Sequence, residues 1–518
     1  MPGLGSDADG ADDLLTPLLT AAQAYPAFER MVLQAEERVA MCFRIFDPRT
    51  ALRSPEARAI GETWVDLIAH TLSRGVRLDI TLSDFEAVVR PDYHARATRC
   101  HRLIVAAGEI SGRPELLRVR AALHPARIGW LPALVLWPRA RGYLLRTAAE
   151  LNAKTPAGRA RARSELPALE KYWRTEPDGT VALRRWKMPR LTPVTHHQKL
   201  AVADGKLLYI GGLDLNERRY DTTDHARPAS ETWHDLQVLL RGPGAAPAET
   251  HLDSFVDVTL GKPAPKTPGL LRTVSRARRS HAFLMSPIPV LSELARAHAE
   301  AIDGAERLIY LETQFFRDTR LARRLARRAR ARRDLRLILI LPARPDDVAF
   351  QGNSGHDARY GEYLQAKCIE ILRRGFGDRL FIGSPAQHRK AKRGEPSLYG
   401  APLIYLHAKL SIFDDTLAIV SSANLNGRSF YWDTEAGVPL TSRIQIEDLR
   451  RQCYAHWLRS ALTERFVAHE TAVEAWRGRA RENVRRAPAD RRGYILPYAS
   501  GPARRFGRNL PGIPEEMV

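Results

Sequence analysis

One segment of this chain occurs twice. The sequence HQKLAVAD at residues 197–204 recurs 210 positions later as HAKLSIFD at residues 407–414. The similarity continues at the same offset, where GGLDLNER at residues 211–218 corresponds to SSANLNGR at residues 421–428. One HxKxxxxD match in a long chain carries little weight, but two matches in register with a second shared segment are not expected by chance. The chain is therefore built from two copies of one unit, each with a histidine, a lysine and an acidic residue at fixed spacing.

The repeat also includes the elements that precede these motifs. Each half opens on an apolar run, ERVAMCFRIF (37–46) and ERLIYLETQF (306–315), followed by a helical stretch and a second apolar run. Alternating strand, helix and strand predicts α/β units around a parallel or mixed sheet buried on both faces. We expect an N-terminal extension (1–29), a first repeat (30–250), a second repeat (251–473) and a partly disordered C-terminal extension (474–518).

The two halves differ in length ahead of the motif. The second apolar run ends 115 positions before the first motif histidine but 66 before the second, which predicts an insertion at about residues 85–190. Residues 123–146 of this insertion are apolar and aromatic, interrupted by prolines and flanked by arginines. This segment either packs on its parent domain or inserts side chains among lipid headgroups while its arginines meet phosphates. The side chains suited to the second role are Trp130, Trp137, Tyr143, Arg139, Arg141 and Arg146.

Composition indicates a globular protein with an unusually positive charge. Hydrophobic residues make up 44% of the 518 and charged residues 27%, as in ordinary globular proteins, but the net charge is +21. That charge reflects either solvated arginines on helix faces or a field that gathers anionic lipid headgroups or nucleic acid.

No secretion signal or bilayer-spanning run is evident, so we expect a cytoplasmic or peripheral membrane protein, or one secreted without a recognisable signal. Four scattered cysteines (Cys42, Cys100, Cys368 and Cys453) predict buried thiols in a reducing compartment, with neither disulfide framework nor metal site.

Duplicated histidines and lysines suit phosphodiester chemistry. A neutral histidine can attack phosphorus if its other ring nitrogen is held as a donor, and a second, protonated histidine can give the leaving alkoxide its proton. Lysines and a side-chain amide that bind the non-bridging oxygens of the phosphate neutralise the charge that develops in the transition state, so neither a metal nor a cofactor is required. Aligning WHDLQVLL (233–240) with DTEAGVPL (433–440) puts Asp235 opposite Glu435, and we predict that these carboxylates, from the next strand of each half, hold the histidine Nδ1 atoms. The candidate catalytic set is His197, Lys199, Asp204, His407, Lys409, Asp414, Asp235 and Glu435, with Asn424, Asp214 and Ser422 binding substrate.

Two HxKxxxxD motifs, with GGxD after the first and SxN after the second, resemble the phospholipase D superfamily. WHD running into Gly242-Pro243, and IYLETQFF at residues 309–316, are similar to segments of its phospholipid-cleaving branch. The resemblance covers roughly residues 30–470. It implies two α/β repeats packed about a pseudo-twofold axis, one metal-free active site at their junction, and covalent catalysis through one motif histidine, usually the N-terminal one. Two positions depart from the pattern: Ser421 replaces a glycine, and Asp214 stands where the second copy has Asn424.

We therefore expect a phospholipase D-like phosphodiesterase that hydrolyses glycerophospholipids to phosphatidic acid and a headgroup alcohol. Transfer to an alcohol uses the same intermediate, so a phosphatidyltransferase such as a cardiolipin or phosphatidylserine synthase is a close variant. A nuclease would suit the charge, although nucleases of this superfamily are often short single-motif chains that dimerise; a scaffold is disfavoured because both motifs are intact. The expected partners are a phospholipid substrate and an acidic membrane surface, and we expect a monomer. Glu312 and Gln314 either support the residues of the site from behind or are polar core residues whose hydrogen bonds are satisfied elsewhere.

Overall fold

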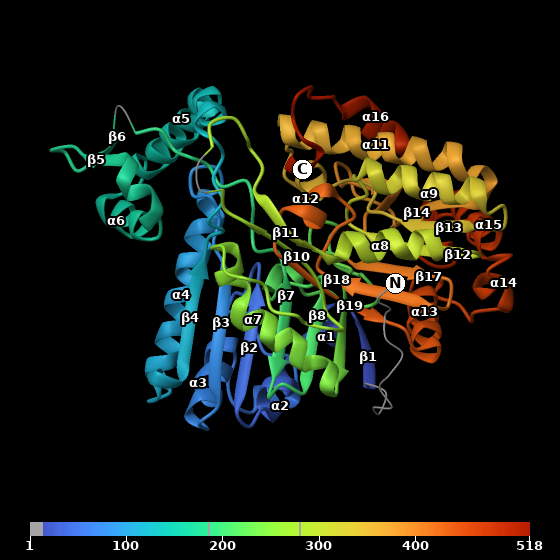
Figure 1. Ribbon diagram of the computed structural model, residues 1–518, viewed down its shortest axis with the longest axis horizontal. Coiled ribbons are helices and arrows are strands. Elements are labelled where there is room, and N and C mark those ends of the chain that lie inside the picture. The colour runs from blue at the N-terminus through green and yellow to red at the C-terminus, as the bar shows by residue number, and fades with distance from the viewer. Residues whose placement is uncertain (1–13, 185–186, 279–280) are drawn as a thin grey trace.

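Two large mixed β-sheets, flanked by helices, form the body of the molecule (Figure 1). The computed structural model describes residues 14–184, 187–278 and 281–518. The first sheet has the order β1 (Leu14–Leu19), β9 (Leu236–Arg241), β8 (Leu207–Gly211), β7 (Lys199–Ala203), β2 (Arg38–Phe43), β3 (Arg77–Ser83) and β4 (Leu117–Ala122). The second has the order β11 (Ile288–Ser292), β10 (Leu271–Arg276), β19 (Glu435–Leu440), β18 (Leu417–Ser421), β17 (Lys409–Phe413), β12 (Leu308–Thr313), β13 (Arg336–Ile340), β14 (Leu380–Pro385) and β20 (Ile495–Pro497).

The two sheets repeat one topology. In each, two parallel neighbours follow the opening strand (β2–β3–β4 and β12–β13–β14), and the motif strand pairs antiparallel to its other side (β7 and β17). A hairpin joins this motif strand to the next strand (β8 and β18), and a further antiparallel strand (β9 and β19) pairs beyond it. The predicted duplication and the mixed α/β fold class are confirmed.

Helices cover the outer face of each sheet. Over the first lie α1 (Thr20–Gln34), α2 (Pro55–Arg58), α3 (Trp64–Ser73) and α4 (Pro91–Ile110), and over the second lie α8 (Glu293–Gly304), α9 (Thr319–Ala331) and α11 (His356–Phe376). In α9, Asp318 caps the N-terminus by accepting from the amides of Arg320 and Leu321. Both leucines of the helix and all its alanines but the last are buried. The arginine run of this segment is therefore largely a solvated helix face.

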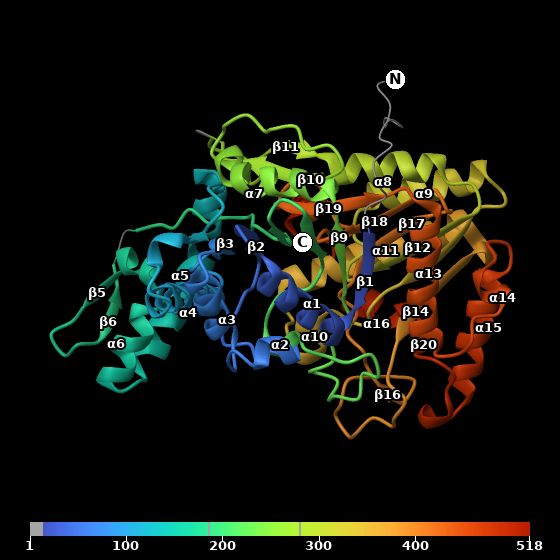
Figure 2. The same cartoon turned by 90° about the horizontal axis from the view of Figure 1, so that it is seen from below.

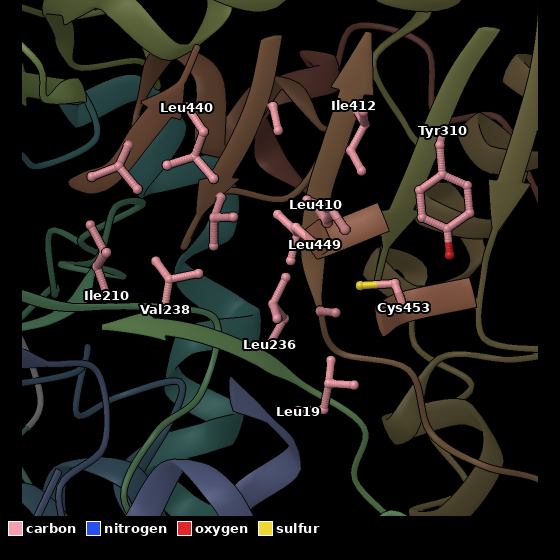
Figure 3. Packing of buried hydrophobic residues seen from close by; sticks show 14 of the residues in the cluster. Leu19, Ile210, Leu236, Val238, Tyr310, Leu410, Ile412, Leu440, Leu449 and Cys453 are labelled. Atoms are coloured by element: carbon pink, nitrogen blue, oxygen red, sulfur yellow. The ribbon is translucent and has the colours of Figure 1, made fainter. Parts of the chain in front are cut away.

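The inner faces of both sheets share one core, drawn in Figure 3. Side chains of the first sheet, such as Ile210 and Val238, lie in the same cluster as Leu410 and Ile412 of the second. Strands β8 and β9 contact β18 and β19 directly. The remaining faces are covered by α7 (Ala246–Thr259), α13 (Arg443–Leu458) and α15 (Ala472–Arg485). Both repeats are thus joined by continuous apolar packing.

Reciprocal contacts relate the halves as a pseudo-twofold axis does. The amide of His197 donates to the carbonyl oxygen of Thr434 at 2.8 Å, and the amide of His407 donates to that of His234 at 2.7 Å. Each motif histidine therefore pairs with the residue before the aligned carboxylate of the other half. This reciprocity places both motifs at one junction.

Among the residues that the structure describes, parts of both expected terminal extensions form strands of the two sheets, which corrects the two expected boundaries. Strand β1 pairs with β9 inside the region expected as an N-terminal extension. Residues after 474 form α15, whose Trp476 is buried, then β20, which pairs with β14, then α16 (Ser500–Phe506). The arginine-rich and proline-rich composition of this tail obscured those contacts in the sequence.

The insertion also begins later than expected. Helix α4 and strand β4 belong to the repeated core, so the extra residues follow β4. They form α5 (Trp130–Asn152), α6 (Pro156–Ser164), β5 (Trp173–Thr175) and β6 (Val181–Leu183), which project from one corner of the molecule in Figures 1 and 2. The smaller elements elsewhere are α10 (Asp346–Phe350), α12 (Gly427–Tyr431), α14 (Glu464–Val467), β15 (Ser397–Leu398) and β16 (Ala401–Pro402).

The four cysteines are buried and unpaired, as predicted. In the part of the chain that the structure describes, no helix combines the length and apolar character needed to span a bilayer.

Candidate active site

The acidic residue of each motif lies away from the histidine. Asp204 and Asp414 occupy the turns beyond β7 and β17, with φ angles of 52° and 51°. Their carboxylates accept from the backbone amides of residues 36–38 and 306–308 at 2.8–3.0 Å. Each lies five positions beyond its lysine, about 16 Å along a strand at about 3.3 Å per residue. Their assignment to the catalytic set is therefore corrected: they fasten each hairpin turn to the start of the neighbouring strand.

Both motif histidines meet a carboxylate of the opposite half. Nδ1 of His197 lies 2.9 Å from Oε1 of Glu435, and Nδ1 of His407 lies 2.6 Å from Oδ2 of Asp235. An ionised carboxylate holds the proton on Nδ1 and leaves the lone pair of Nε2 free. The sequence alignment identified these carboxylates, but not that the pairing crosses between the halves.

The motif lysines lie beside their histidines. Nζ of Lys199 is 3.4 Å from Nδ1 of His197, and Nζ of Lys409 is 2.9 Å from Nδ1 of His407. Each ammonium also donates to the carbonyl oxygen of its own histidine. Both lysines are buried, so their charges act through little water. An extended backbone accounts for this arrangement, because side chains two residues apart project from one face.

Gly212 and Ser422 occupy equivalent positions in the two repeats, and each lies against one of the two carboxylates. A Cβ at Gly212 would overlap Oδ1 of Asp235 and lie 3.1 Å from Cδ of Lys409. At the equivalent position, the hydroxyl of Ser422 donates to Oε2 of Glu435. Ser422 thus positions a carboxylate, and its predicted contact with substrate stays a prediction.

Asp214 and Asn424 lie at the same junction with different partners. Oδ1 of Asp214 accepts from the amide of Ile45 at 3.0 Å and is 4.0 Å from Nζ of Lys199. Nδ2 of Asn424 donates to Oε1 of Gln314 at 3.3 Å. Gln314 therefore supports a site residue. Glu312 instead accepts from the Tyr310 hydroxyl and the Trp457 indole, and so has core partners.

Burial lowers the pKa of both histidines well below the usual value, and nearby cations lower it further. Beside His197 these include Lys199 and Arg44; beside His407 they include Lys409 and Arg219. The free site therefore favours neutral imidazoles. Burial also lowers the pKa of Lys409 to about 7, against the opposing charge of Asp235.

The same burial raises the pKa of the carboxylates. The pKa of Asp235 rises to about 6 and that of Glu435 to about 8, each opposed by a nearby lysine. Burial thus penalises the ammonium groups of Lys199 and Lys409 as well as the two carboxylates. A bound phosphodiester would offset the penalty on the ammonium groups and raise the pKa values of the histidines and lysines.

Three arginines near the histidines were not recognised in the sequence. Arg44 and Arg428 act on His197 and Arg219 on His407 through their charges. The guanidinium of Arg219 also stacks 3.4 Å from the ring centroid of Trp233. Only Arg428 had a sequence signal, since it ends the second shared segment; its counterpart there is Arg218, one position before Arg219.

An apolar cavity of about 220 Å³ adjoins the site. It reaches Arg428 and Thr195, the latter two residues before His197. The largest share of its lining is apolar and includes Phe85, Val89, Ile128, Leu136, Leu191 and Met285. Sequence reasoning did not find it, because these residues come from five separate segments.

Comparisons with known proteins place the chain in a family. A model described as "Cardiolipin synthase, PLD-like domain" matches residues 299–457, which contain the second motif. Phospholipase D1 of Schizosaccharomyces pombe is 22% identical over 382 residues, 54% of this chain and 28% of that protein. Phospholipase D alpha 4 of Arabidopsis thaliana is 22% identical over 349 residues, 47% of this chain and 45% of that protein. The chain thus spans less than half the length of these curated relatives.

Among solved structures, phosphatidylserine synthase of Haemophilus influenzae Rd KW20 aligns over 90% of this chain and 93% of its own, with a TM-score of 0.46 and 12% identity. The family assignment rests instead on the matched domain model and the curated relatives, together with the duplicated topology. The chain belongs to the phospholipase D superfamily.

Proposed function

We propose that this protein cleaves the phosphodiester bond of glycerophospholipids through a phosphohistidine intermediate, passing the phosphatidyl group to water or to an alcohol. The observation that carries the lipid substrate is the apolar cavity that reaches Arg428 beside His197. A phospholipid needs an apolar site next to its phosphate, whereas a nucleic acid backbone does not. Superfamily membership itself indicates a phosphodiesterase or phosphotransferase.

In the proposed first step, Nε2 of His197 attacks phosphorus while Glu435 holds its Nδ1–H. The bond from phosphorus to the headgroup oxygen breaks, and His407, protonated when the anionic substrate binds, gives its Nε2 proton to that oxygen. Lys199, Lys409 and Asn424 neutralise the non-bridging oxygens. In the second step, neutral His407 takes a proton from water or an alcohol, whose oxygen attacks phosphorus and releases His197.

His197 is assigned as nucleophile because its side chain is 11% exposed against 3% for His407. A nucleophile must reach the phosphorus atom of an incoming lipid, whereas a proton donor needs access only in the direction of the leaving oxygen. The N-terminal motif histidine is also the one that the family resemblance implies.

An assay on several substrate classes tests the function. Purified protein is expected to release headgroup from phospholipids and, with ethanol present, to form phosphatidylethanol. Because lysines neutralise the phosphate charge, initial rates on a soluble short-chain phosphodiester are expected to persist in EDTA. Hydrolysis of single-stranded or duplex DNA without lipid turnover would support the nuclease alternative, which the net charge of +21 favours. Loss of the rate in EDTA, restored by magnesium, would contradict the proposed chemistry.

Helix α5 offers a surface for reaching lipid. One face packs inward through Ala133, Ala140 and Leu144, while Trp130, Leu134 and Val135 are 51%, 53% and 77% exposed. The helix start is hydrogen-bonded to residues 282 and 284, which brings exposed Phe283 and Leu284 beside it. We call Trp130, Leu134, Val135, Phe283 and Leu284 the α5 patch. Leu136 of the same helix lines the apolar cavity.

Removing the charge of α5 is expected to weaken binding to acidic vesicles. Arg139, Arg141 and Arg146 are exposed on the helix, and each is worth about 1 kcal/mol near an anionic surface, so the triple glutamine variant should bind on the order of 100-fold more weakly. Vesicle sedimentation measures this, with a soluble phosphodiester to check the catalytic site. The matched control replaces the exposed Arg323, Arg327 and Arg330 of α9, which changes the net charge equally. Equal weakening in both variants would mean that only net charge matters.

A further inference from the structure

Three histidines from distant positions meet behind the active site. His225 and His234 lie in the loop between β8 and β9, the latter two residues before β9 begins, and His456 lies on α13 of the second half. One ring nitrogen from each falls within 4.8 Å of the other two. The proposed reaction uses none of these three imidazoles, which pack against Trp457 and Tyr494.

The hydrogen bonds leave nitrogens available to a cation. Asp221 occupies Nδ1 of His225 at 2.7 Å, so Nε2 of His225 points inward, 3.1 Å from Nε2 of His456. Glu312 lies 3.7 Å from Nε2 of His234. Nδ1 of His234 is buried and has no hydrogen-bond partner among the described residues.

The arrangement of these side chains matches that of a zinc site, both in the candidate ligands and in the hydrogen bonds that orient them. Two nitrogens bound to one tetrahedral zinc at about 2.0–2.1 Å lie about 3.4 Å apart, close to the separation of the two facing Nε2 atoms. Histidine ligands usually donate their second nitrogen to a carboxylate, the place that Asp221 takes beside His225. Imidazoles without thiolates suit zinc and other borderline divalent ions better than magnesium or calcium.

We propose that His225, His234 and His456 bind one zinc ion, with a fourth position left for solvent or for the carboxylate of Glu312. Oε2 of Glu312 has no hydrogen-bond partner among the described residues, and it faces His234. The ion ties the loop of the first repeat to α13 of the second.

The site adjoins the segment that orients a catalytic histidine. The carbonyl oxygen of His234 accepts from the amide of His407, and the next residue, Asp235, holds Nδ1 of His407. Asp221 also accepts from the amide of Trp233 at 2.7 Å. Zinc therefore acts as a positioning element for residues 233–235, and takes no part in the reaction.

Metal content and thermal stability of the full chain test the proposal without reference to activity. Protein purified from zinc-supplemented cells is expected to contain about one zinc per chain by mass spectrometry, and its cobalt-substituted form to show visible d–d absorption. Both signals should fall at least tenfold in His225→Ala and in His456→Gln. The second variant keeps a hydrogen-bonding side chain in case the first does not fold. His298→Gln removes another buried histidine, bonded to Ser411, and should retain the metal.

Added zinc should raise the melting temperature of metal-stripped wild-type protein but not of the two cluster variants. A buried ion leaves slowly, so stripping requires chelator under partly denaturing conditions followed by refolding. Wild-type protein that neither contains zinc nor is stabilised by it would overturn the proposal, as would full zinc retention in His456→Gln. Neither result bears on the proposed lipid cleavage, because the reaction does not use the ion.

Discussion

His197→Ala is expected to lower turnover by about 10⁴-fold or more and to abolish covalent labelling by substrate. The variant removes the nucleophile, and no other group reaches phosphorus in its place. His407→Asn is expected to behave differently, because the first step needs only a proton for the leaving group while the second needs a base. With a substrate whose leaving group is already a weak base, His407→Asn should accumulate phosphorylated His197. Acid-sparing quench and peptide mass spectrometry measure the adduct.

His298→Gln serves as the control for loss of a buried histidine, since His298 bonds Ser411 and the Leu294 carbonyl outside the site. It should label at the wild-type stoichiometry per folded molecule. A phosphorylated adduct on His407 instead of His197 would reverse the two roles. Wild-type protein that turns over substrate with no adduct on either histidine, under rapid quench, would contradict covalent catalysis.

Glu435→Gln and Asp235→Asn are expected to lower turnover by about 10³–10⁴-fold while blocking different steps. An amide can donate to Nδ1 and so favour the wrong tautomer, in which Nε2 carries the proton; this loss is comparable to that of an orienting aspartate in other histidine-based sites. Glu435 holds His197 and Asp235 holds His407, each across the junction. Glu435→Gln should therefore prevent adduct formation, whereas Asp235→Asn should slow release of an adduct that still forms.

Single-turnover kinetics separate these steps. Ser422→Ala provides a milder comparison, because it removes only the hydroxyl that donates to Glu435 and leaves the carboxylate in place. If Glu435→Gln slowed release and Asp235→Asn prevented labelling, each carboxylate would serve the other histidine and the crossed pairing would be wrong. Equal effects of both variants on both steps would show that the pair acts only on overall charge.

The sequence was sufficient to predict the repeated fold and the side chains that carry its main chemistry. Two in-register HxKxxxxD segments predicted the duplicated α/β sheets, because identical strand patterns bury the same faces. The fixed spacing of the motif also explains why His197 and Lys199 lie together, since residues two apart in an extended segment share a face. Alignment of the following strands also identified Asp235 and Glu435. In contrast, the spacing of the motif was misleading for Asp204, whose role is set by the turn beyond the strand.

Tertiary structure alone decided which groups cross the junction. The pairing of Glu435 with His197 depends on how two repeats pack, and repeat packing is not encoded in spacing within either repeat. The cluster of His225, His234 and His456 likewise joins segments up to 231 positions apart, and the apolar cavity joins segments that lie still farther apart in the sequence. Local sequence thus determined the elements and the reactive side chains, because strand and turn propensities act between near neighbours. Their partners were decided by burial between the repeats, which brings distant segments together to remove apolar surface from water.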